Sequence, residues 1–394
     1  MSLTRRRLFA GMFETPLGPR HEWVSARGRE AAMAGHTETQ TGAPGSTLIR
    51  ISSNENPLGP GQHVLDAIVG TFPEAARYPG NATRTEGALV SALAQMYGAR
   101  HEQVVLAPGS GEILTHAVRA FTSATKPLVT AWPSFEAPRD TAKKIGTPIR
   151  EVGFDSHLRI DLAKLVEASK GAGLVFFCNP NNPTSTVHGQ AAVADTVKAI
   201  RAASPDTVIL IDEAYHDYVT DPSYGSAVPL AITTPNVFVT RTFSKAYGMA
   251  GLRVGYAIGD QRTIKAIAAF KMPNALGTLS LGGAMASLAN QAHIAAERAR
   301  NTEVRAFTIK AFADMGITGA DSQANFLLME IKRPVKGFRD ACRAAGVLVG
   351  RDFPSFEQSH CRISIGTMEE MQRAVGVFKT IVAGAPSTSR QQGR

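Results

Sequence analysis

Cysteine is scarce in this sequence, and long apolar runs are missing. The 394 residues include three cysteines, which lie far apart and form neither a CxxC pair nor a metal-binding spacing. We therefore expect no structural disulfide and no metal site, and the composition is typical of a reducing compartment. No stretch is long and apolar enough to predict a membrane-spanning helix.

Clusters of basic residues are also missing, although the chain carries a formal net charge of +9. The lysines and arginines are scattered, and no basic run is interleaved with aromatic residues, which argues against a nucleic-acid partner. We expect the excess charge to favour small anionic ligands such as phosphates and carboxylates. Hydrophobic residues make up 44% of the chain and charged residues 19%, as in a globular enzyme with a large core.

The N-terminus contains only part of an export signal. Residues 4–10 (Thr-Arg-Arg-Arg-Leu-Phe-Ala) are similar to a twin-arginine motif. Such a signal also needs an apolar stretch of about 7–15 residues, whereas charged residues and prolines follow here from Glu14 onward. We predict a cytoplasmic protein, with periplasmic export as the alternative.

Alternating strand and helix patterns predict a large α/β domain at residues 76–280. Near-continuous apolar strands separated by helical patterns indicate a mostly parallel central sheet with helices on both faces. Polar residues follow the carboxyl end of each strand, where open α/β sheets bind their ligands. The expected strands are 103–107, 127–131, 173–178, 207–211, 237–239 and 253–258.

The flanking segments have a different composition. Residues 47–75 and 281–384 are predicted to form the N-terminal and C-terminal parts of a smaller α+β domain, with one long helical stretch from about 280 to 313. Residues 1–46 are predicted to be a flexible arm. The tail at residues 385–394 is predicted to be disordered because its composition is polar.

Lys245 is the centre of the candidate site. It follows the buried strand at 237–239, and desolvation there would lower the pKa of its amine, as a nucleophile or base requires. The hydroxyls of Thr242 and Ser244 and the guanidinium of Arg253 are donors that would converge on a phosphate. A lysine beside a phosphate-binding cup indicates pyridoxal phosphate (PLP) bound covalently through the amine. The alternative for this segment alone is a surface lysine in a loop.

Asp212 gives a second signal, because it follows the apolar run at 208–211. Burial alone would raise the pKa of its carboxyl group, so an ionised form requires a cationic partner. A pyridinium nitrogen is such a partner, and a paired aspartate keeps the ring protonated as an electron sink. The alternative is an aspartate that caps the following helix, and the combination with Lys245 and Arg253 favours the cofactor site.

With these signals together, the chain resembles the fold-type I PLP-dependent aminotransferases, nearest the histidinol-phosphate aminotransferase branch. The resemblance covers about residues 48–382. It rests on NENP at 54–57, RYP at 77–79, GSGE at 109–112, NPNNPT at 179–184, DEAY at 212–215, TFSK at 242–245, GLR at 251–253 and RISIGT at 362–367.

The resemblance implies roles for the matching residues around the cofactor. Lys245 would hold the cofactor and move the Cα proton, while Asp212 would pair with the ring nitrogen. The other implied contacts are Asn182 and Tyr215 at the phenolic oxygen, Phe135 on the ring face, Thr242, Ser244 and Arg253 at the phosphate, and the backbone N–H groups of Ser110, Gly111 and Glu112 at a helix N-terminus.

The resemblance also implies substrate contacts and a partner subunit. Arg362 would bind the substrate α-carboxylate as a bidentate fork, Arg351 would bind a distal substrate phosphate, and Asn56 would face the substrate. A solvated loop position for Arg351 and a turn position for Asn56 are the alternatives. Tyr78 would reach the cofactor phosphate of a neighbouring subunit, which implies a homodimer with shared sites.

The expected activity is transamination between an amino donor and a 2-oxo acid. Histidinol phosphate and 2-oxoglutarate, substrates of histidine biosynthesis, are the leading pair. An aromatic amino-acid aminotransferase is the first alternative, favoured if Arg351 faces solvent. A PLP-dependent decarboxylase on the same scaffold, which would release CO2, is another. A PLP-binding regulatory protein is the alternative outside enzymology, although the set of lysine, aspartate and arginine argues against it.

Overall fold

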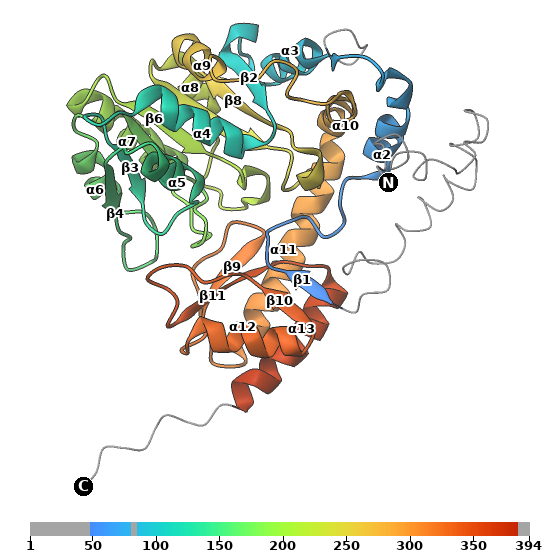
Figure 1. The fold of residues 1–394 in the computed structure, drawn as a ribbon. Coiled ribbons are helices and arrows are strands. Elements are labelled where there is room, and N and C mark those ends of the chain that lie inside the picture. Colours follow the sequence, from blue (N-terminus) through green and yellow to red (C-terminus); the bar gives the residue numbers. More distant parts are fainter. Residues whose placement is uncertain (1–47, 80–84, 385–394) are drawn as a thin grey trace, which may run out of the picture. The chain divides into compact units, whose positions relative to one another are not determined.

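The computed structural model describes residues 48–79 and 85–384, which all belong to one compact unit. The predicted arm with its twin-arginine-like motif and the predicted C-terminal tail lie outside the described residues. The larger of the two cores in this unit is organised around a seven-stranded sheet (Figure 1).

The seven-stranded sheet is mostly parallel, as predicted. Its strand order is β2-β8-β7-β6-β5-β3-β4, and β8 alone runs antiparallel to its neighbours. The edge strand β4 was not predicted, because Arg150 and Glu151 interrupt its apolar pattern. The bounds are β2 (Val104–Ala107), β3 (Leu128–Ala131), β4 (Ile149–Val152), β5 (Leu174–Cys178), β6 (Val208–Asp212), β7 (Val237–Thr242) and β8 (Gly255–Gly259).

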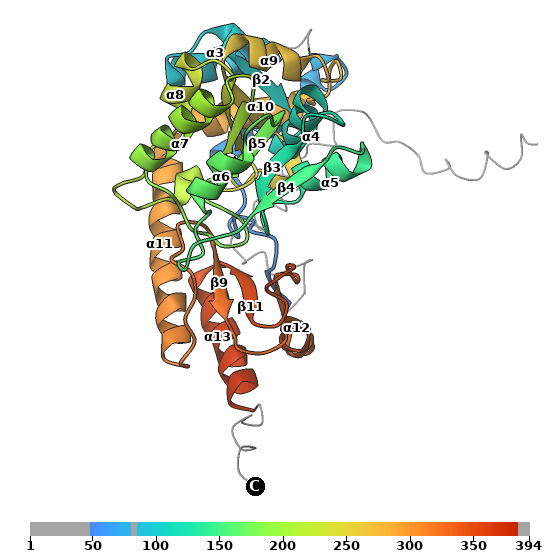
Figure 2. The ribbon, with the colours of Figure 1, turned by 90° about the vertical axis from the view of Figure 1, so that its left-hand side faces the viewer.

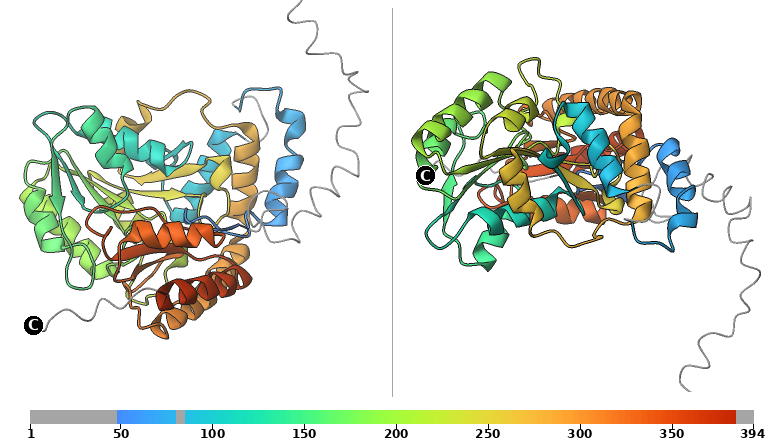
Figure 3. Two further views of the ribbon diagram at one scale, coloured as in Figure 1. Left: turned by 60° about the horizontal axis from the view of Figure 1, so that its bottom comes forward. Right: turned by 90° about the horizontal axis from the view of Figure 1, so that it is seen from above.

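Both faces of this sheet are covered by helices, because alternate strand residues point to opposite sides. In β6, Ile209 and Ile211 pack into one core cluster, and Val208 and Leu210 pack into another. Figure 3 shows the two helical layers. The first face is covered by α3 (Glu86–Tyr97), α6 (Leu162–Ala168), α7 (Gln190–Ala203), α8 (Val228–Thr233) and α10 (Thr278–Ala289), and the second by α4 (Ser110–Phe121), α5 (Ala137–Lys144) and α9 (Gln261–Ala268).

The smaller core contains two short sheets (Figure 2). One pairs β1 (Ile49–Ile51) with β10 (Val347–Val349) in parallel, and the other pairs β9 (Phe326–Glu330) with β11 (His360–Ser364) antiparallel. The helices α12 (Val335–Ala344) and α13 (Met368–Ala383) pack against them together with the C-terminal half of α11 (Gln291–Ala313). The phenylalanines Phe312, Phe338 and Phe378 fill the space between these elements.

Two details differ from the predicted organisation. The helical stretch expected from about 280 to 313 is broken at Asn290, whose side chain accepts a hydrogen bond from the N–H of His293 and so caps α11. The segment 47–75 also divides between the cores. β1 joins the smaller core, whereas Val64 of α2 (Gln62–Val69) packs in the larger one.

Short 3₁₀ turns connect several of these elements. Their bounds are Phe72–Glu74, His101–Gln103, His216–Tyr218 and Ala250–Leu252. None of the helices in the described residues is both long and apolar enough to cross a membrane. In the same part of the chain, no group of three or more His, Cys, Asp or Glu side chains could hold a metal ion, and the three cysteines are buried and unpaired.

Candidate active site

Two cavities that share Phe135, Tyr215 and Lys245 lie at the carboxyl ends of the central strands. The first has a volume of about 170 Å³ and the second about 420 Å³. The first is lined by Ser110, Gly111, Phe135, Cys178, Asp212, Ala214, Tyr215, Thr242, Ser244, Lys245 and Arg253. The structure therefore brings together nine of the residues predicted from the sequence.

Asp212 is the last residue of β6 and is buried. Burial raises the pKa of its carboxyl group to about 6, and a hydrogen bond from Thr240 opposes that rise. The Thr240 hydroxyl donates to Oδ1 of Asp212 over 2.9 Å. A carboxylate held in this way at the end of a buried strand is prepared to accept a hydrogen bond from a cationic ring nitrogen.

Lys245 lies beyond the end of β7 and lines both cavities. Burial lowers the pKa of its amine to about 8, and the nearby guanidinium of Arg362 acts in the same direction. Its Nζ lies 5.5 Å from the centre of the Tyr215 ring and donates to the backbone carbonyl of Ser53 over 3.5 Å. A substantial neutral fraction near pH 8 suits an amine that forms a covalent bond to an aldehyde.

Part of the lining of the first cavity is a cup of hydrogen-bond donors. Helix α4 begins at Ser110 without a side-chain cap, so its first N–H groups point toward the cup with the positive end of the helix dipole. The guanidinium of Arg253 donates to Ser244 Oγ over 3.2 Å. Gly109 has φ 82°, a backbone conformation that favours glycine, and a Cβ atom there would displace that guanidinium. These groups could hold a phosphate.

The Tyr215 hydroxyl is fixed by two asparagine side chains. Nδ2 of Asn54 lies 3.2 Å from it, and Nδ2 of Asn182 lies 3.4 Å from it. Since both amides donate to the oxygen, the phenolic proton remains available to an acceptor in the cavity. Burial raises the pKa of Tyr215 above its ordinary value, so the phenol keeps that proton.

Arg362 is a buried cation without a buried counter-ion. Its side chain bonds the Asn182 amide oxygen over 2.8 Å and the Ser52 carbonyl over 2.7 Å. Its Nε is buried and has no hydrogen-bond partner, and no carboxylate of the described residues pairs with it. Burial lowers the pKa of this guanidinium to about 10. A carboxylate or phosphate in the second cavity would supply the missing negative charge.

Arg351 lines the second cavity and is half-exposed. Its guanidinium forms an ion pair with Glu136 and lies 4.2 Å above the ring of Phe353. The sequence did not single out Glu136, Arg339 or Arg343, which also line this cavity. Arg339 and Arg343 come from α12, and only the packing of the smaller core brings that helix to the site.

Three predicted residues are placed outside the cavities. The Asn56 side chain bonds two backbone groups. Its amide nitrogen donates to the Ala246 carbonyl, and its amide oxygen accepts from the Leu58 N–H and so closes a turn. The neighbouring Asn54, at φ 56°, lines the second cavity in its place. The Glu112 side chain pairs with His116 within α4. Tyr78 is 74% exposed.

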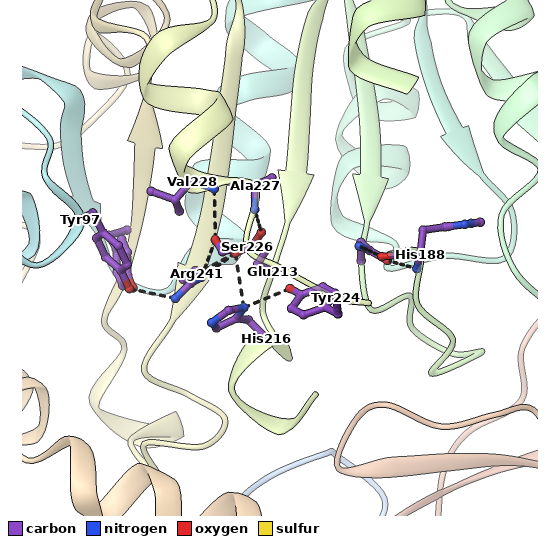
Figure 4. A network of polar contacts seen from close by, with 11 residues as sticks. Tyr97, His188, Glu213, His216, Tyr224, Ser226, Ala227, Val228 and Arg241 are labelled. Carbon is purple, nitrogen blue, oxygen red and sulfur yellow. Dashed lines mark hydrogen bonds and ion pairs between the residues drawn. The ribbon is translucent and has the colours of Figure 1, made fainter. Parts of the chain in front are cut away.

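A second polar network is formed around Glu213 and Arg241 (Figure 4). The Arg241 guanidinium bonds the Glu213 carboxylate over 2.7 Å, and both side chains contact Ser226. His216 lies in this network 3.1 Å from the hydroxyl of Tyr224, and burial lowers the pKa of its imidazole. Its ion pair joins Glu213, which directly follows β6, to Arg241 of β7.

The residues of the first cavity fit the PLP expected from the sequence. A buried carboxylate lines it for a ring nitrogen, and an arginine and an uncapped helix N-terminus line it for a phosphate. An amine of lowered pKa lies on the same cavity wall. The adjoining cavity, with its unpaired guanidinium, is the place for the substrate's anionic groups.

Comparisons with known proteins agree with this geometry. The model of the family "Aminotransferase class I and II" matches residues 46–378. A histidinol-phosphate aminotransferase of Symbiobacterium thermophilum is 33% identical over 84% of this chain and 90% of its own. An aromatic amino acid aminotransferase of Thermobifida fusca is 34% identical over 86% and 91%. The structure of a Sinorhizobium meliloti histidinol-phosphate aminotransferase with pyridoxal-5'-phosphate superimposes with a TM-score of 0.79 at 24% identity, covering 90% of this chain and 94% of that one.

Proposed function

Because this chain belongs to the class I and II aminotransferases, we propose that it is a PLP-dependent transaminase of histidinol phosphate and 2-oxoglutarate. The observation that carries the proposal is the unpaired, buried guanidinium of Arg362 beside the Lys245 and Asp212 cavity. Such an arrangement serves an amino substrate that carries an anion next to its reacting carbon. The reaction would be a step of histidine biosynthesis.

The bound cofactor supplies an electron sink for the bond that breaks at the substrate Cα. Asp212 would keep the ring nitrogen protonated, and Tyr215 with Asn182 would hold the phenolic oxygen. The donors at Thr242, Ser244, Arg253 and the start of α4 bind the phosphate. Lys245 takes the proton from the donor Cα and returns one in the reverse half of the cycle. Phe135 covers the ring.

Two arginines divide the recognition of the substrates. Histidinol phosphate carries a phosphate ester where an amino acid carries its carboxylate, so the donor and the 2-oxo acid present different anions. Arg362 binds the carboxylate of the 2-oxo acid, and Arg351 extends the positive surface toward the phosphate of the donor. Arg343 of α12 lines the same cavity and adds to that surface.

An aromatic amino-acid aminotransferase is the second candidate. The Glu136 carboxylate neutralises Arg351, and Phe353 presents an aromatic face at the same place. Both features would suit an apolar ring better than a dianion. The Thermobifida fusca relative is named for this activity.

We also propose a homodimer with shared sites. Tyr78 is exposed, and Leu58, Phe72 and Met272 expose large apolar side chains that a second copy could cover. The cytoplasmic location expected from the sequence stays a prediction.

The purified protein, reconstituted with PLP, tests the function directly. Glutamate formation from 2-oxoglutarate would be followed with histidinol phosphate, histidinol, phenylalanine and tyrosine as donors. We expect turnover with histidinol phosphate to exceed that with histidinol by about tenfold or more, since one added charge-assisted contact contributes that much. Preference for phenylalanine would establish the aromatic activity instead, and CO2 release without glutamate formation would refute transamination.

A further inference from the structure

Thr240 is a buried hydroxyl that faces the candidate ring-nitrogen partner. It lies opposite Asp212 in the parallel pairing of β6 with β7, and its side chain is fully buried. Its Oγ1 lies 2.9 Å from Oδ1 of Asp212. Among the described residues, no other hydrogen bond of this hydroxyl is found, so holding the carboxylate is its one polar contact.

The direction of this hydrogen bond is fixed by chemistry. An ionised carboxylate can only accept, so Thr240 donates, and a donor stabilises the charged form over the neutral one. The backbone N–H of Ala214 bonds the same carboxylate. The Cys178 sulfur, 3.9 Å from Oδ2, is at most a weak donor. A carboxylate accepts about four hydrogen bonds, so capacity remains for a ring N–H.

The next residues along the two strands, Glu213 and Arg241, fix the register that brings Thr240 to Asp212. The Glu213 N–H donates to the Thr240 carbonyl over 2.9 Å. One residue further along, Arg241 and Glu213 are joined by their ion pair on the opposite face (Figure 4). Because alternate strand residues point to opposite faces, that ion pair holds Thr240 and Asp212 together on the cavity side.

We propose that Thr240 is a positioning residue for the cofactor ring: its hydroxyl orients the Asp212 carboxylate and keeps it ionised, so that the ring nitrogen stays protonated. This inference rests on the proposed function, since it needs a cofactor with a basic ring nitrogen. The residue acts through Asp212 and does not line the cavity itself. Burial raises the pKa of Asp212 and this hydrogen bond lowers it. The resulting pKa of about 6 agrees with the proposed role of Thr240.

Cofactor affinity tests the inference without relying on turnover. The apoenzyme would be titrated with PLP, and with the analogue in which carbon replaces the ring nitrogen, for wild type, Thr240→Val and Thr240→Ser. We expect Thr240→Val to weaken PLP binding about tenfold, as the loss of one charge-assisted hydrogen bond does. Thr240→Ser should bind PLP like wild type, and the analogue should not distinguish the valine variant from wild type.

Matched variants separate positioning from a structural effect. Thr130→Val removes a buried strand hydroxyl in β3 whose one hydrogen bond within the described part of the chain goes to the Ala131 carbonyl, and it should leave PLP affinity unchanged. In an Asp212→Asn background, Thr240→Val should add no further loss. Equal weakening of PLP and the analogue, or a full additional loss in that background, would overturn the inference.

Two other outcomes of the PLP titration distinguish the inference from the proposed function. Unchanged PLP affinity in the Thr240→Val variant would also overturn the inference. If that variant does not fold, Thr240→Ala makes the same measurement. Failure of the wild-type protein to bind PLP would instead refute the proposed function, so the two failures are distinguishable.

Discussion

Replacing Arg362 with methionine should nearly abolish transamination without destabilising the fold. Burial lowers the pKa of this guanidinium from its ordinary 12.5 to about 10, so holding the charge costs the fold about 3 kcal/mol. Because the pKa in the folded state lies below the ordinary value, this cost is fully present at every pH below about 10. It is offset by the hydrogen bonds to Asn182 and Ser52, which contribute about 1–3 kcal/mol each.

The two contributions are of similar size, so the Arg362→Met variant should unfold within about 1–3 kcal/mol of wild type. The catalytic loss should be much larger. A bidentate carboxylate contact contains two charge-assisted hydrogen bonds, about 3–6 kcal/mol together, which corresponds to a fall of roughly 10²- to 10⁴-fold in kcat/KM for 2-oxoglutarate.

The measurements are urea unfolding at pH 7.5 and steady-state kinetics with 2-oxoglutarate varied. Arg305→Met is the matched control, because Arg305 is also buried and bonds the Ala324 carbonyl and Thr220 but lines neither cavity. By the same balance it should unfold within about 1–3 kcal/mol of wild type, and it should leave KM for 2-oxoglutarate unaltered. A loss of more than about 3 kcal/mol in the Arg362→Met variant, or less than a tenfold fall in kcat/KM, would show that Arg362 is structural.

Three other predictions follow from the same site. Lys245→Ala should abolish both the visible absorbance of the bound cofactor and transamination. In the wild type, the rate of cofactor attachment should rise about tenfold per pH unit up to about pH 8 and then level off, because only the neutral amine reacts. A flat profile from pH 6 to 9 would contradict the assignment. Arg351→Ala should lower kcat/KM about tenfold for phosphorylated donors alone, and an equal loss with plain amino donors would count against its phosphate role. Mixing inactive Tyr78→Ala and Lys245→Ala proteins should restore activity if each Tyr78 serves the partner subunit, whereas a site served by its own Tyr78 would stay inactive.

The residues at the ends of strands could be predicted because their positions are set locally. Asp212 ends an apolar run and Thr242 follows the apolar run at 237–239, and the carboxyl ends of parallel strands meet at one edge of a sheet. That these residues lie close together in the first cavity therefore followed from the order of strands and helices. The start of the helix near Ser110 was predictable because a glycine-rich turn precedes it, whereas its phosphate-binding role was implied by the family resemblance.

The outer part of the site could not be predicted in the same way. Arg343 is brought to the second cavity by the packing of α12 in the smaller core, which no local pattern encodes. The choice between Asn54 and Asn56 depends on one left-handed residue, Asn54, which turns its side chain to the cavity while Asn56 closes the turn. The hydroxyl of Thr240 was missed because the strand pattern alone does not show which side chain it faces.

Along β6 and β7, side chains alternate between the two faces of the sheet, so residues with a role at the site lie next to residues that stabilise the sheet. Asp212 and Thr240 serve the cavity face, while Glu213 and Arg241 form the ion pair on the other face. Substitutions at the first pair should act directly on the site, whereas substitutions at the second pair should act first on the pairing of the two strands. The acidity of the ring partner and the cohesion of the sheet therefore depend on different side chains, although the two pairs are adjacent in the chain and the ion pair fixes the register of the first pair.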